Sequence, residues 1–221
     1  LIGLFIGYPH LTALDQGVMT LVQEHRGPTL DEIAVTFTLI GEFHNMLLFS
    51  ALLTGLLLLC RQWRQALFAG GTLLCTALAN TATKNFFARV RPEVLTDPLT
   101  TYSMPSGHAS GAFALFLTLG VLAGRGQPPR MRLTWLLLAC LPALSIALSR
   151  VYLGAHWPTD VLAGAMLAAC VCAASLWLNQ RQTPLNAMPF KVWWLILPAL
   201  LALFSFFALR HLPPAMLRYA Y

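Results

Sequence analysis

The sequence predicts an all-α fold, a polytopic bundle of transmembrane helices, from its composition and from the pattern of its apolar residues. Hydrophobic residues make up 57% of the 221 positions and charged residues only 10%, whereas ordinary globular domains carry roughly 25% charged residues. Several apolar runs reach or approach the ~20 residues that a helix needs to cross a bilayer. Segments of alternating polarity, about ten residues long and typical of a transmembrane β-barrel, are absent.

The first 42 residues are expected to hold a partial first span and two amphipathic helices that lie along the membrane surface. Leu1–Gly7 is apolar but too short to span, and the chain starts without Met. We therefore expect the tail of a truncated helix and a longer precursor. Residues 10–42 are more polar, with apolar residues at helical spacing. Gly27-Pro28 breaks this pattern, and Thr29 is the expected cap of the second helix.

Six apolar runs follow, each divided from the next by a short polar segment. They are residues 43–60, 63–88, 108–124, 133–148, 158–178 and 192–209. The second run would be about 39 Å long as a helix, enough to protrude from a bilayer. Pro142 predicts a kink in the fourth run, and Pro158 suits the first turn of the fifth.

The polar segments between the runs differ in charge. If every run crosses the membrane, the loops at 61–64, 125–132 and 179–191 share one face, and they contain basic residues but no acid. The other face has as many Lys and Arg residues, but several of these are candidates for a site. With them set aside, the positive-inside rule makes the acid-free face cytoplasmic. The opposite face then points to the periplasm if the membrane is a bacterial inner membrane.

Two classes of partner are not expected. The net charge is +6, but the arginines are spread over short loops, so a nucleic-acid partner is not indicated. The five cysteines lie in or at the ends of apolar runs, and we expect free thiols without a disulfide framework or a zinc site.

The alternation of the runs brings the reactive side chains to one membrane face. These residues leave the second and fourth runs and enter the third and fifth: Lys84, Arg91, Ser106, His108, Arg150, His156 and Asp160. Three cations imply an anion with more charge than one carboxylate, and Arg suits phosphate oxygens. The helix that starts at residues 105–108 adds unsatisfied N–H groups, which Gly107 would let a ligand approach closely. The pattern predicts a phosphate site.

The two histidines can divide the work of phosphoryl transfer. His156 and Asp160 are four residues apart, so the carboxylate can orient the imidazole of a nucleophilic His156. His108, at another helix start, is the expected acid for the leaving oxygen and base for water. The cations would stabilise the transition-state charge, so no metal is needed, and the sequence has no cluster of acids to hold one.

The motifs Lys84-(six residues)-Arg91-Pro92, Pro105-Ser106-Gly107-His108 and Ser149-Arg150-(five)-His156-(three)-Asp160 resemble the three-part signature of the type 2 phosphatidic acid phosphatase superfamily. Every signature position is present with unchanged spacing.

The resemblance implies a metal-independent phosphatase that works without a cofactor through a phosphohistidine. It places the nucleophile on His156, the orienting carboxylate on Asp160 and the acid and base on His108. It places the phosphate contacts on Lys84, Arg91, Ser106, Gly107 and Arg150. Membrane members of the family act on lipid phosphates such as phosphatidic acid, phosphatidylglycerophosphate, undecaprenyl pyrophosphate or lipid A.

The resemblance also implies a domain division. Residues 43–179 would form the catalytic core of a six-helix family fold whose first helix is truncated here, and 180–221 an additional transmembrane helix and tail. With its first helix truncated, the chain is similar to proteins that join such a domain to a DedA-type membrane domain.

Other interpretations remain open. A phosphotransferase would pass the phosphate from His156 to another lipid, and a transporter would use the charges to guide an anion. Vanadate-dependent haloperoxidases share the signature but are soluble. Arg89 is interpreted as a surface or lipid-headgroup contact, and Trp157 as part of an aromatic belt.

Overall fold

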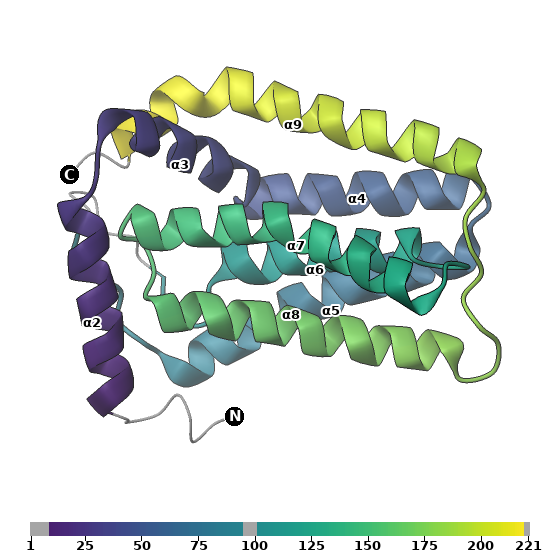
Figure 1. The fold of residues 1–221 in the computed structure, drawn as a ribbon, viewed down its shortest axis with the longest axis horizontal. Helices are drawn as coiled ribbons and strands as arrows, with labels where there is room; N and C mark the ends of the chain where they lie inside the picture. The colour runs from purple at the N-terminus through teal and green to yellow at the C-terminus, as the bar shows by residue number, and fades with distance from the viewer. Residues whose placement is uncertain (1–8, 95–100, 219–221) are drawn as a thin grey trace.

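The computed structural model describes residues 9–94 and 101–218, and these residues form helices without a strand. The helices are α2 (Pro9–Glu24), α3 (Pro28–Ile40), α4 (Phe43–Leu59), α5 (Trp63–Phe87), α6 (Gly107–Ala123), α7 (Pro129–Tyr152), α8 (Pro158–Gln180) and α9 (Phe190–Arg218). Helices α4 to α9 run roughly along one long axis, and α2 lies across one end of the bundle (Figure 1). The predicted all-α class is confirmed, and Leu1–Gly7 lies outside the described residues.

The turns alternate between the two ends of the bundle. The α4–α5, α6–α7 and α8–α9 connections lie at one end (Figure 1). The end of α5, the start of α6 and the α7–α8 turn lie at the other end, beside α2. All the predicted site residues therefore belong to the same end.

The helices do not correspond one by one to the six predicted spans. Within the described part of the chain, α5, α7, α8 and α9 are each long and apolar enough to cross a membrane. Helices α3 and α4 meet at a bend of 52° and pass this test only together. Helix α6 has 17 residues, about 26 Å at 1.5 Å per residue, which is shorter than a bilayer core of about 30 Å.

Helix α3, which is predicted to lie along the membrane surface, packs on the helical bundle. It packs against α7 and α9, and its buried residues include Val35, Thr38 and Leu39. Its N-cap is Gly27 with Pro28 in the first turn, so the predicted cap at Thr29 is wrong. Proline has no N–H to leave unsatisfied and is pre-set for a helix start, which explains the earlier boundary.

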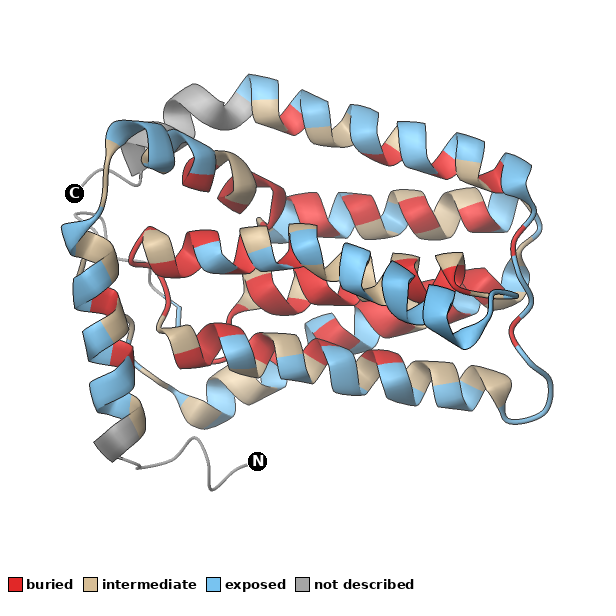
Figure 2. Ribbon diagram, in the orientation of Figure 1, coloured by how far each residue is buried: buried red, intermediate tan, exposed pale blue. Residues whose placement is uncertain are grey.

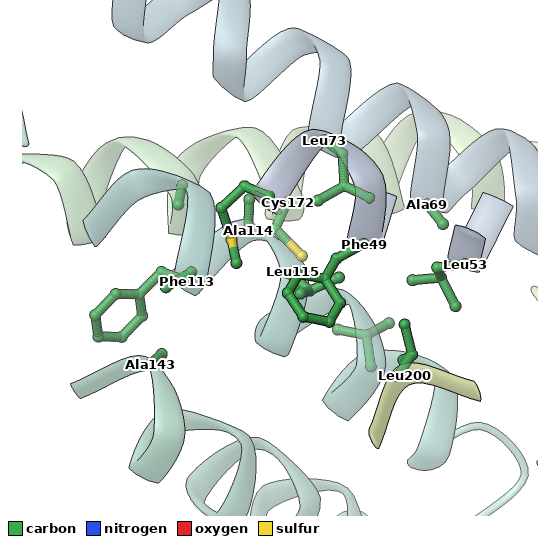
Figure 3. Packing of buried hydrophobic residues seen from close by; sticks show 14 of the residues in the cluster. Phe49, Leu53, Ala69, Leu73, Phe113, Ala114, Leu115, Ala143, Cys172 and Leu200 are labelled. Atoms are coloured by element: carbon green, nitrogen blue, oxygen red, sulfur yellow. The ribbon is translucent and has the colours of Figure 1, made fainter. Parts of the chain in front are cut away.

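Helix α6 forms the centre of the bundle, with its most extensive packing against α7 and α8. Burial is concentrated along α6 and toward the site end of α7 and α8, whereas the far ends of α7 and α8 are largely exposed (Figure 2). In this core, Phe113 of α6 lies beside Ala143 of α7, and Leu115 lies among side chains from α4, α8 and α9 (Figure 3).

Gly164 lets α8 approach the start of α6. A Cβ atom at this position would lie 2.6 Å from the carbonyl oxygen of Ser106 and 3.1 Å from the amide nitrogen of Ser110. Backbone atoms cannot rotate away as a flexible side chain can, so a larger residue must separate the two helices.

Gly164→Ala is therefore expected to lower the free energy of unfolding by about 1–3 kcal/mol through overpacking. Thermal unfolding in detergent micelles measures the effect. Gly71→Ala in α5 is the matched control, because a Cβ there has no neighbour within 4 Å and alanine favours a helix over glycine by roughly 0.5–1 kcal/mol. Equal unfolding midpoints for the two variants would contradict the close packing of α6 on α8.

Candidate active site

Four helix ends present the residues predicted to bind and transfer phosphate. Lys84 lies in the last turn of α5, and Arg91 follows that helix. Ser106 is the N-cap of α6, Arg150 lies in the last turn of α7, and Asp160 lies in the first turn of α8. His108 lies within electrostatic range of four of these groups: Arg150, His156, Arg91 and Lys84. The structure thus brings the predicted residues into one cluster.

The turn between α7 and α8 fixes the backbone of His156. The amide groups of Ala155 and His156 both donate to the carbonyl oxygen of Arg150, at 3.0 and 3.2 Å. Gly154 has a φ of +70°, and a Cβ there would lie 2.6 Å from Cβ of Val94. This position requires glycine both for its conformation and for the close approach of Val94. The turn leaves the His156 side chain buried.

The two ring nitrogens of His156 face different partners. Nδ1 lies 3.5 Å from Oδ2 of Asp160, without a hydrogen bond in the described structure. Nε2 lies 3.0 Å from Nη1 of Arg91. Because a guanidinium can only donate, Nε2 is the accepting nitrogen, and the proton of a neutral ring lies on Nδ1 toward the carboxylate.

The surroundings of His156 favour the neutral form of its ring. Burial lowers the pKa of His156 well below its ordinary value, and the positive charges of Arg91 and Arg150 lower it further. Both effects disfavour the imidazolium form. A neutral imidazole with an unprotonated Nε2 is the form that can act as a nucleophile.

Asp160 connects three parts of the site. Its Oδ1 accepts a hydrogen bond from Nη1 of Arg89 at 2.8 Å, and its Oδ2 accepts one from the amide of Trp157 at 3.0 Å. Its backbone carbonyl accepts a bond from the amide of Ser106 at 2.9 Å. The start of α6, the start of α8 and the segment after α5 are therefore fixed relative to one another.

The three predicted phosphate-binding cations are held by neutral oxygens. Nε of Arg91 donates to the carbonyl oxygen of Thr101 at 2.6 Å, and Nζ of Lys84 donates to that of Tyr102 at 2.5 Å. Arg150 is almost fully buried, and its Nη1 donates to the hydroxyl of Thr38. Among the described residues, carbonyl and hydroxyl oxygens thus position these side chains, since such oxygens accept hydrogen bonds from guanidinium and ammonium groups.

The start of α6 offers further donors. The hydroxyl of Ser106 accepts a bond from the amide of Ala109 at 3.4 Å and caps the helix. The amide groups of Gly107 and His108 have no acceptor among the described residues, as is usual in a first helical turn. A Cβ on Gly107 would meet only Oδ1 of Asn80, at an ordinary 3.6 Å. Packing in the described structure thus does not require glycine there, which fits a role toward a ligand.

Several buried polar residues around the site were not predicted from the sequence. Thr38 supports Arg150, and Asn80 donates to the hydroxyl of Ser110 at 2.9 Å below the start of α6. Asp15 of α2 is buried and pairs with Arg89 at 2.7 Å. A signal existed in each case, since a polar residue in an otherwise apolar helical stripe must find a partner when it is buried.

Two residues that were predicted to be peripheral, Arg89 and Trp157, lie beside the predicted catalytic residues. Arg89 is only 27% exposed and pairs with Asp15 and Asp160, so its interpretation as a surface or headgroup contact is wrong. The ring of Trp157 lies 5.6 Å from Cζ of Arg89, and its Nε1 donates to the carbonyl oxygen of Val90. Trp157 therefore packs against this arginine.

Comparison with known sequences gives a consistent result. The sequence model of the PAP2 superfamily matches residues 47–184, more than half of the chain. An undecaprenyl-diphosphatase from Sulfolobus acidocaldarius is 39% identical over 95 residues, 41% of this chain and 40% of that protein. A decaprenylphosphoryl-5-phosphoribose phosphatase from Mycobacterium tuberculosis is 35% identical over 127 residues, 55% of this chain and 65% of that protein. The alignments thus span less than two thirds of these relatives.

Two solved structures share the fold. The PAP2 type phosphatidylglycerolphosphate phosphatase from Bacillus subtilis superposes with a TM-score of 0.70 at 23% identity, over 80% of this chain and 90% of that one. LpxE from Aquifex aeolicus superposes with a TM-score of 0.59 at 25% identity, over 74% of this chain and 94% of that one.

Two of the buried polar residues near the site, Asp15 and Thr38, precede residues 47–184, which the family model matches.

Proposed function

This chain belongs to the PAP2 superfamily, and we propose that it hydrolyses a lipid phosphomonoester or pyrophosphate without a metal ion, through a phosphohistidine on His156. The observation that carries this proposal is the environment of His156. Its Nδ1 faces the carboxylate of Asp160, and its Nε2 faces Arg91, one of the predicted phosphate-binding cations. A nucleophilic nitrogen and a group that binds the reacting phosphoryl oxygen are thus 3.0 Å apart.

In the proposed first step, Nε2 of His156 attacks the phosphorus atom and the bond from phosphorus to the lipid oxygen breaks. His108 donates a proton to that leaving oxygen. Asp160 stabilises the positive charge that develops on the imidazole ring. Arg91 exchanges its bond with Nε2 for a bond to a phosphoryl oxygen, because the attacking lone pair must be free.

In the proposed second step, His108 accepts a proton from a water molecule, which attacks phosphorus and breaks the P–N bond. Inorganic phosphate and the free histidine result. Lys84, Arg91 and Arg150 stabilise the charge of the equatorial oxygens, and the amides of Gly107 and His108 add donors at the start of α6. The hydroxyl of Ser106 can donate to phosphate while it accepts the bond from Ala109.

The substrate and the membrane face are part of the same proposal. The two relatives above are named for prenyl-linked phosphates, and the apolar exteriors of α7 and α8 suit a site that receives a lipid. We place residues 43–179 in the catalytic core. The basic loops at the end opposite the site favour an active site that faces the periplasm from a bacterial inner membrane.

His156→Ala is expected to lower kcat by at least about 1000-fold, because the nucleophile is lost. Binding of the lipid phosphate should persist, since the cations remain. Phosphate release in detergent micelles from undecaprenyl pyrophosphate, phosphatidic acid and phosphatidylglycerophosphate measures the effect. His25→Ala is the matched control, because His25 is exposed and its hydrogen bonds in the described part of the chain go to Leu21 and Val22 of α2, the helix that it follows.

Unchanged turnover in His156→Ala would reject the mechanism. Labelled phosphate that passes to an added acceptor lipid rather than to water would identify a phosphotransferase. A wild-type protein that releases no phosphate from any of these lipids would favour transport.

The pH dependence follows from the lowered pKa of His156. The free enzyme needs this ring neutral, so the acid limb of kcat/KM should lie below the ordinary imidazole pKa of about 6.5. Arg91→Gln removes a positive charge that opposes protonation, so the limb should move to higher pH as activity falls. Arg64→Gln serves as the control, because Arg64 lies in the first turn of α5, at the end of this helix opposite to Lys84. A downward shift in Arg91→Gln would contradict the assignment of the limb to His156.

Vanadate is expected to inhibit competitively, because its trigonal-bipyramidal form resembles the transition state and would occupy the cluster of Lys84, Arg91 and Arg150. A chelator should leave turnover unchanged. Steady-state kinetics with each reagent test both statements, and loss of activity on chelation that returns with added Mg²⁺ would overturn the metal-independent mechanism.

A further inference from the structure

Arg89 joins two buried carboxylates from distant parts of the chain. Its Nη1 donates to Oδ1 of Asp160 at 2.8 Å, and its Nη2 donates to Oδ2 of Asp15 at 2.7 Å. Asp15 is 1% exposed and Asp160 is fully buried. Asp15 belongs to α2, which lies across the site end of the bundle (Figure 1).

Thr159 holds Asp15 in this position. Its backbone amide donates to Oδ1 of Asp15 at 3.0 Å, and its hydroxyl donates to Oδ2. Nη1 of Arg89 also donates to that hydroxyl at 2.7 Å. Asp15, Arg89 and Thr159 thus form a closed ring of hydrogen bonds beside the start of α8. Both oxygens of Asp15 are used, which accounts for the burial of its charge.

The hydrogen bonds among Asp15, Arg89 and Thr159 determine which oxygen of Asp160 binds Arg89. An arginine that faces a single carboxylate tends to bind both oxygens with two parallel N–H groups. Here Asp15 engages Nη2, and Asp160 receives a bond from Arg89 only at Oδ1. Oδ2 of Asp160 remains directed to the amide of Trp157 and to Nδ1 of His156, 3.5 Å away.

Asp15 also changes the net charge of the group that Arg89 forms with Asp160. Arg89 with Asp160 alone would be a neutral pair, and the carboxylate would have little charge left for the imidazole. With Asp15 the group carries one net negative charge. That charge is what stabilises a histidine ring when it becomes positive during phosphoryl transfer.

We propose that Asp15 is a positioning residue for the reaction, which acts through Arg89 to orient Asp160 and to keep its charge directed at His156. This inference rests on the proposed function. It makes α2 part of the active-site apparatus, although α2 precedes residues 47–184, which match the family.

Asp15→Asn tests the inference, because it removes the charge but keeps an oxygen for the amide of Thr159. We expect kcat to fall at least ~10-fold while KM changes by less than ~3-fold, since Asp15 does not touch the substrate. In this variant Arg89 can bind both oxygens of Asp160, and the charge of Asp160 then stabilises the His156 imidazolium less. The acid limb of kcat/KM should move to lower pH, because the imidazolium form is less well stabilised.

The double variant Asp15→Asn/Arg89→Gln distinguishes action through Arg89 from a separate effect. If Asp15 works through Arg89, the double variant should have the same kcat as Arg89→Gln alone. Its acid limb should lie above that of Asp15→Asn, because Asp160 no longer shares its charge with a cation. The other groups whose charges act on His156, namely Arg91, Arg150 and Lys84, are unchanged throughout.

Asp31→Asn is the matched control for loosened packing of the first helices. It breaks the ion pair between Arg26 and Asp31, whose atoms lie 3.1 Å apart near Tyr152. We expect a lower unfolding midpoint with unchanged kcat and unchanged acid limb.

Three results would overturn the positioning role. They are an unchanged kcat and acid limb in Asp15→Asn, additive losses in the double variant, or an equal loss of kcat in Asp31→Asn. Each presupposes an active wild type, which distinguishes failure of this inference from failure of the proposed function. A wild type that releases no phosphate, although vanadate protects it from unfolding, would reject both.

Discussion

Asp160 is fully buried in the first turn of α8. Its two carboxylate oxygens and its backbone carbonyl oxygen accept hydrogen bonds from three different segments. A buried charge without donors would cost several kcal/mol. The donors therefore have to stay in place, and with them the start of α6, the start of α8 and the segment that follows α5. The remaining site residues lie on these segments or beside them, so their geometry depends on how this one group is satisfied.

The helices can meet around Asp160 because small residues allow close contact. Gly164 lets α8 approach the backbone of α6, and Gly41, at the bend between α3 and α4, faces the ring of His108. A Cβ on Gly41 would lie 2.8 Å from Cδ2 of that ring. The bend between α3 and α4 thus abuts the proposed acid and base, and the packed core shown in Figure 3 holds α4 and α6 behind it.

The family match covers the signature but not everything that supports it. Thr38 of α3 holds Arg150, and Asp15 of α2 holds Arg89, and both lie before residue 47, where the match begins. Both are buried polar residues with a charged partner, and such pairs are costly to break from one side. The first helices of this chain are therefore structurally coupled to the site.

The sequence by itself determined the helical class, the membrane-spanning character and the cluster of signature residues. Apolar runs of about 20 residues predict helices that cross a bilayer. Because successive spans run in opposite directions, the end of one span and the start of the next lie at the same membrane face. That constraint alone brought Lys84, Arg91, His108 and His156 together. The roles assigned to them remain proposals.

Only the tertiary structure decided which groups hold Asp160 and where α3 lies. Asp15 and Thr159 are 144 residues apart, and no local pattern pairs residues at that distance. The sequence of α3, with 13 residues, suits a membrane surface as well as a buried position, because its apolar face can be covered by lipid or by α7 and α9. Arg89 could equally have faced a headgroup. Its place was settled by two buried carboxylates, whose positions depend on the packing of the whole bundle.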